Sequence, residues 1–114
     1  MTNVFDKQEL LEELDGDREF LEESLEMLTA DTPVLIDQIR DGIESGDAEK
    51  IRIAAHTLKS MVGNFCAQPA FEAALHVEKI GSDGDLTQSA AGLVSLEDQV
   101  QRLQQELHKF VDEM

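Results

Sequence analysis

The chain has 114 residues, of which 41% are apolar, 4% aromatic and 30% charged, and this length fits a single domain over residues 1–114. Its 25 acidic and 9 basic residues give a formal net charge of −16, so nucleic-acid phosphates and anionic membrane surfaces would repel it. We therefore expect partners that are neither nucleic acid nor membrane.

Apolar residues recur at helical spacing along the chain, without the alternation of a half-buried strand, so the predicted class is all-α. Leucines within residues 10–14 predict a short first helix that ends at residues 15–17. Thr32 and Pro33 predict the start of a third helix that ends before Gly46, because threonine caps helix N-termini and proline suits the first helical position. Between the first and third helices, an apolar stripe predicts a second helix; it comprises Phe20, Leu21, Leu25 and Leu28.

The second half of the chain predicts three more helices. Asp47 can cap a helix over about residues 47–65, and Pro69 begins the next one. Residues 81–85 are the clearest predicted loop, and a last helix follows from about Thr87. Short connections between amphipathic helices predict an antiparallel up-and-down four-helix bundle with a short additional N-terminal helix.

The last predicted helix carries apolar residues at alternating spacings of three and four. These are Leu93, Leu96, Val100, Leu103, Leu107 and Phe110. Such a stripe is typical both of a long helix that packs on its own domain and of a coiled-coil dimer seam. The oligomeric state stays open on this pattern, and a monomer is the expected state.

The sequence also predicts a cytoplasmic location. Cys66 is the single cysteine, so an intrachain disulfide is excluded and a reducing compartment is the simplest expectation. The N-terminal residues lack a basic stretch followed by an apolar run, and no window approaches the roughly 18 apolar residues of a membrane span.

Residues 51–65 form the most informative segment. At about 100° per residue, its apolar residues gather on one side of a helix, and His56 falls roughly opposite their centre. His56 should therefore face solvent. Residues three, four and seven positions away share its exposed strip. They are Arg52, Lys59, Ser60 and Gly63.

Charge distinguishes this segment from the rest of the chain. Residues 47–66 contain two acidic and three basic residues, a net charge of +1, whereas the remainder sums to −17. A small cationic spot on an acidic molecule favours a phosphoryl group and a partner with an acidic pocket, although it also fits an ordinary solvated helix face. Ile53, about 60° around the helix from His56, either contacts that partner or packs under a neighbouring helix.

The stretch Ala55-His56-Thr57-Leu58-Lys59-Ser60, followed by Asn64-Phe65-Cys66-Ala67, resembles the signature of histidine-containing phosphotransfer (HPt) domains. Residues 16–21 and the runs from Thr32 to Leu35 and from Ile43 to Asp47 also resemble this family. The resemblance covers nearly the whole chain. It implies a phosphoryl carrier that acts between response-regulator receiver domains, with a hybrid sensor histidine kinase as a further candidate partner.

The resemblance also implies roles for individual residues. His56 would accept the phosphoryl group, and Lys59 would neutralise the phosphoryl oxygens. In the family, a Gln or Glu twenty-two residues after the histidine commonly bonds the non-reacting ring nitrogen, and this chain has Glu78 there. A carboxylate at that position would hold the Nδ1–H tautomer and leave Nε2 free. Arg52, Ile53, Ser60 and Gly63 are the candidate partner-binding residues.

Two positions depart from the family pattern. Ser60 replaces a glycine that gives the partner clearance, and the small serine should preserve function. Cys66 stands where glycine is common and where a left-handed backbone is convenient, so Asn64 is expected to adopt that conformation instead.

The sequence supports no enzyme, metal centre or cofactor of the chain's own. It has no Gly-rich phosphate loop or ATP-binding signature, so any Mg²⁺ is expected on the partner receiver domain only. His76 and His108 lack the surrounding signature, and Cys66 lacks companion ligands at zinc spacing. The alternative function is a phosphorylation-independent helical binding module, for a receiver domain or another signalling protein.

Overall fold

The structure, a computed structural model, describes residues 4–114. This part of the chain contains helices and no strands, which confirms the predicted all-α class. None of its helices is long and apolar enough to cross a membrane. The elements are α1 (Lys7–Leu14), α2 (Arg18–Ser45), α3 (Ala48–Gly63), α4 (Gln68–Asp83), a 3₁₀ turn η1 (Leu86–Gln88) and α5 (Ser89–Glu113).

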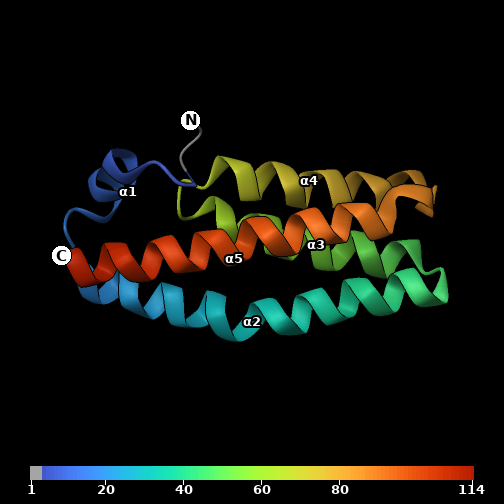
Figure 1. Cartoon of the computed structure of the whole chain (residues 1–114), viewed down its shortest axis with the longest axis horizontal. Helices are drawn as coiled ribbons and strands as arrows, with labels where there is room; N and C mark the ends of the chain where they lie inside the picture. The colour runs from blue at the N-terminus through green and yellow to red at the C-terminus, as the bar shows by residue number, and fades with distance from the viewer. Residues whose placement is uncertain (1–3) are drawn as a thin grey trace.

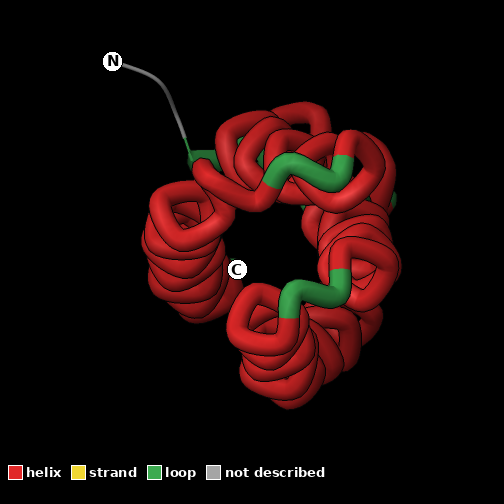
Figure 2. Tube along the Cα trace, turned by 90° about the vertical axis from the view of Figure 1, so that its right-hand side faces the viewer, coloured by secondary structure: helices red, strands yellow, loops and turns green. Residues whose placement is uncertain are grey.

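The four long helices run alternately up and down and form a closed ring (Figures 1 and 2). Helices α2 and α4 each pack against both α3 and α5, so the predicted antiparallel bundle is confirmed. Helix α1 lies at one end of the bundle, near the start of α4 (Figure 1). A backbone hydrogen bond of 3.0 Å from the Asp6 N–H to the Cys66 carbonyl ties the segment before α1 to the turn after α3.

Helix α2 is continuous through Pro33, so the predicted helix start at Thr32 is wrong. The Thr32 hydroxyl donates to the Leu28 carbonyl, 2.6 Å away, instead of capping a new helix. Proline removes one helical hydrogen bond, but buried leucines on both sides of it, Leu28 and Leu35, hold the two halves of α2 on one core.

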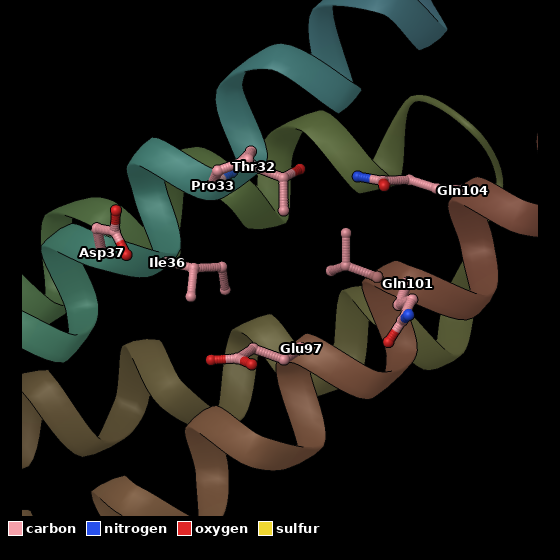
Figure 3. Close-up of a pocket in the computed structure, with 8 residues that line it drawn as sticks. Thr32, Pro33, Ile36, Asp37, Glu97, Gln101 and Gln104 are labelled. Atoms are coloured by element: carbon pink, nitrogen blue, oxygen red, sulfur yellow. The ribbon is translucent and has the colours of Figure 1, made fainter.

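A groove of about 300 Å³ lies between α2 and α5 beside Pro33 (Figure 3). Its lining mixes apolar, acidic and amide side chains. They are Thr32, Pro33, Ile36, Asp37, Glu97, Val100, Gln101 and Gln104.

The core takes its side chains from all four long helices. The whole predicted stripe of α5 is buried inside the bundle, which favours packing on its own domain over a dimer seam. By contrast, Phe20 belongs to a predicted apolar stripe but is 55% exposed, because the buried face of α2 is centred on other residues. Phe5 packs edge-on against Phe110, with ring centroids 5.3 Å apart.

Helix α4 continues through the first three residues of the predicted loop at residues 81–85 and ends at Asp83, followed by Gly84 as its C-cap with a φ of +79°. Gly81 lies at a close approach of α3 and α4. A Cβ atom on it would be 2.7 Å from the backbone nitrogen of Arg52 and 2.8 Å from the backbone carbonyl oxygen of Ala48. The missing side chain of Gly81 therefore allows α3 and α4 to pack closely, although the sequence around it is typical of a loop.

Gly81→Ala should destabilise the bundle by about 1–3 kcal/mol, because backbone atoms of α3 occupy the space that the methyl group needs. Chemical denaturation measures this loss. Gly63→Ala is the matched control, since its added Cβ would meet only the Phe71 ring at 3.4 Å, an ordinary contact. Equal stability of Gly81→Ala and wild type would contradict the close approach.

Candidate functional site

Helix α3 presents His56 to solvent. The Asp47 carboxylate accepts the Lys50 N–H at 3.1 Å and fixes the start of the helix, as predicted. Ile51, Ala54, Ala55, Leu58 and Val62 are buried on the inner face of the helix. The His56 side chain is left 55% exposed, in agreement with the helical periodicity.

Glu78 on α4 brings His56 and Lys59 together. One carboxylate oxygen, Oε2, lies 2.8 Å from His56 Nδ1, and the other, Oε1, lies 2.7 Å from Lys59 Nζ. The side chains of Glu78 and Lys59 are only 16% and 18% exposed. The structure thus places the three predicted site residues in one cluster that bridges two helices.

The carboxylate determines which ring nitrogen of His56 carries the proton. An ionised carboxylate can only accept hydrogen bonds, so Nδ1 must be the donor in this contact. In the neutral imidazole, Nε2 then holds the free lone pair. The exposed ring therefore presents a nucleophilic nitrogen outward while the opposite nitrogen is fixed.

Lys59 keeps the Glu78 carboxyl ionised. The contact with the Lys59 ammonium lowers the pKa of Glu78, burial opposes this shift, and the hydrogen bond with His56 lowers the pKa further. The buried Oε1 atom accepts no well-aligned hydrogen bond. The Lys59 contact at that oxygen, at 2.7 Å, is an ion pair between the ammonium and the carboxylate.

The other predicted residues of the exposed strip differ in their hydrogen bonds and exposure. Arg52 donates to Glu49 at 3.0 Å, so its charge is compensated within α3. The Ser60 hydroxyl donates to the His56 carbonyl at 3.2 Å, and Gly63 is exposed. Ile53 is 52% exposed, so the interpretation that a neighbouring helix covers it is wrong.

The turn after α3 differs from the prediction. Cys66 itself has the left-handed backbone, with a φ of 56°, whereas Asn64 is right-handed with a φ of −66°. Burial, together with Glu13 and Glu9, raises the pKa of the Cys66 thiol to about 12, so the thiol is protonated at neutral pH. Ligand atoms of these three residues lie within 4.8 Å of one another.

Phe71 is a neighbour of the site that sequence spacing did not indicate. It belongs to the apolar stripe of α4, and its partly buried ring has its centroid 5.9 Å from Lys59 Nζ. Helical periodicity relates residues within one helix and gives no register between α3 and α4. His76 and His108 are exposed, as predicted, and make no hydrogen bond or ion pair to a carboxylate within residues 4–114.

Comparison with known proteins identifies one family and one fold. A family model described as "Hpt domain" matches residues 8–106. The crystal structure of histidine-containing phosphotransfer protein B (HptB) from Pseudomonas aeruginosa PAO1 has a similar fold, with a TM-score of 0.89 and 16% identity over 100% of this chain and 99% of that chain. No curated protein matches the sequence.

Glu78→Ala should remove the preference of His56 for the Nδ1–H tautomer, because no carboxylate then accepts that proton. ¹⁵N chemical shifts of the ring nitrogens at a pH where the ring is neutral measure the tautomer populations. Glu49→Ala, on the same face of α3 but paired with Arg52, is the control. An unchanged tautomer population in Glu78→Ala would remove Glu78 from the site.

Proposed function

The chain belongs to the Hpt domain family, and on that premise we propose that His56 is the residue that carries the phosphoryl group. A histidine phosphotransfer role in phosphorelays follows from the family itself. One observation carries the choice of histidine: His56 pairs an exposed ring with a carboxylate 2.8 Å from Nδ1. Neither His76 nor His108 has such a partner within residues 4–114.

In the accepting step, the Nε2 lone pair attacks the phosphorus atom of a receiver's aspartyl phosphate. A P–N bond forms while the acyl phosphate P–O bond breaks, and its electron pair stays on the aspartate carboxylate. Nδ1 keeps its proton, which remains hydrogen-bonded to Glu78. No proton has to move, so no separate general base is needed.

In the donating step, the carboxylate of a second receiver attacks the phosphorus atom. The P–N bond breaks and its electron pair returns to Nε2, which leaves a neutral imidazole. The proton that Glu78 holds on Nδ1 makes this ring a better leaving group than an imidazole anion. The same hydrogen bond therefore assists both directions of transfer.

Lys59 supplies positive charge close to His56, through the carboxylate that both side chains contact. It lies one helical turn after His56, and its ammonium contacts the carboxylate that His56 also contacts. Phosphoryl transfer demands mainly positioning and charge stabilisation, and a lysine in this place can share its charge between Glu78 and the phosphoryl oxygens. Mg²⁺, where it is needed, belongs to the acidic pocket of the receiver.

The docking face combines small and apolar residues around His56. Ser60 and Gly63 leave clearance for the partner, and Ile53 offers an exposed apolar side chain. Receiver domains and kinases are the partner classes of the family, and a hybrid sensor histidine kinase is a candidate donor. A monomer fits the chain's charge of −16, which disfavours self-association, and the buried stripe of α5. The single cysteine favours a cytoplasmic location.

Incubation with a panel of pre-phosphorylated receiver domains and Mg²⁺ tests the assignment. Wild type and His76→Gln should gain acid-labile, base-stable label, whereas His56→Gln should gain none. Label retained by His56→Gln would refute the assignment. If receivers bind the chain equally well with and without His56 and label neither protein, the phosphorylation-independent binding module is the better account.

Ser60→Gln should block transfer while the helix content stays the same, because a long side chain one turn after His56 fills the space that the partner approaches. We expect a decrease of about tenfold or more in the transfer rate, since small displacements of reacting groups have effects of that size. Labelling reactions quenched at a series of times measure the rate, and Gln104→Glu on α5 controls for surface changes elsewhere. Transfer as fast as in wild type would contradict this docking face.

A further inference from the structure

Lys59 has two neighbours that confine its ammonium group. Glu78 Oε1 lies 2.7 Å from Nζ, and the Phe71 ring has its centroid 5.9 Å from the same atom. Both neighbours belong to α4, where Phe71 comes seven residues before Glu78, so they lie on the same side of that helix. The lysine therefore spans from α3 to a carboxylate and an aromatic ring held on a single rigid element.

The Phe71 ring is itself held in place. It lies over Gly63, where an added Cβ atom would be 3.4 Å from its Cδ2 atom and 3.6 Å from its Cε2 atom. The ring is partly buried and packs against the core cluster. A ring fixed in this way limits the positions that the flexible lysine chain can adopt.

We propose that Phe71 is a positioning residue for phosphoryl transfer, which acts by holding the Lys59 ammonium beside His56. The negative face of an aromatic ring attracts an ammonium group within about 6 Å of its centroid. Glu78 attracts the same group by charge. The ring keeps the Lys59 ammonium close to His56 when the ammonium also interacts with the phosphoryl oxygens. This inference rests on the proposed function of His56.

A double-mutant cycle separates positioning from ordinary packing. Phe71→Leu should lower the initial transfer rate from one phosphorylated receiver by about threefold, the size of a partly exposed cation–π contact. Phe71→Tyr keeps the ring face and should transfer at nearly the wild-type rate. In a Lys59→Met background, Phe71→Leu should have no further effect. Phe110→Leu, at the edge-on pair with Phe5, is the control for loss of a ring elsewhere.

A second readout does not depend on transfer. The ε-CH₂ protons of Lys59 should show an aromatic ring-current shift in the NMR spectrum that Phe71→Leu removes and Phe110→Leu preserves. An unmoved Lys59 resonance, or an equal rate loss with and without Lys59, would overturn the inference. A wild type that no receiver labels would instead refute the proposed function, while the Lys59 resonance still decides the role of Phe71.

Discussion

The site depends on one carboxylate that serves two partners on a neighbouring helix. Glu78 is mostly buried, which by itself favours the neutral acid. The Lys59 ammonium beside it lowers its pKa and keeps it charged. Because the charged carboxylate only accepts hydrogen bonds, it fixes the His56 proton on Nδ1 and frees Nε2. The absence of a side chain at Gly81, three residues later, lets α3 and α4 approach closely enough for these contacts.

The charge arrangement suits a carrier that must both take up and release its cargo. Lys59 is already paired with Glu78, so a phosphoryl group on Nε2 receives only a share of the lysine charge. A dedicated, unpaired cation would stabilise the phosphorylated state more strongly and would oppose the donating step. Arg52 is compensated by Glu49 in the same way. These local ion pairs thus reduce the free positive charge of the cationic strip that the sequence suggests.

The sequence predicts the features of this protein that depend on local chemistry. Periodicity places His56 on the outer face of α3, and Asp47 caps that helix as expected. The pairing of His56 with Glu78 follows only from the family resemblance and a count of residues. Contacts between helices explain two further features. Pro33 stays within α2 because core packing outweighs one missing hydrogen bond, and Phe71 meets Lys59 through the register of α3 and α4, which periodicity does not set.

The most direct test locates the phosphoryl group on a single nitrogen atom. The chain is labelled with ¹⁵N-histidine, phosphorylated by a pre-phosphorylated receiver domain with Mg²⁺, and analysed for coupling between ³¹P and ¹⁵N. We expect coupling to Nε2 of His56, with a proton still on Nδ1. Coupling to Nδ1 of His56, or to a nitrogen of His76 or His108, would contradict it.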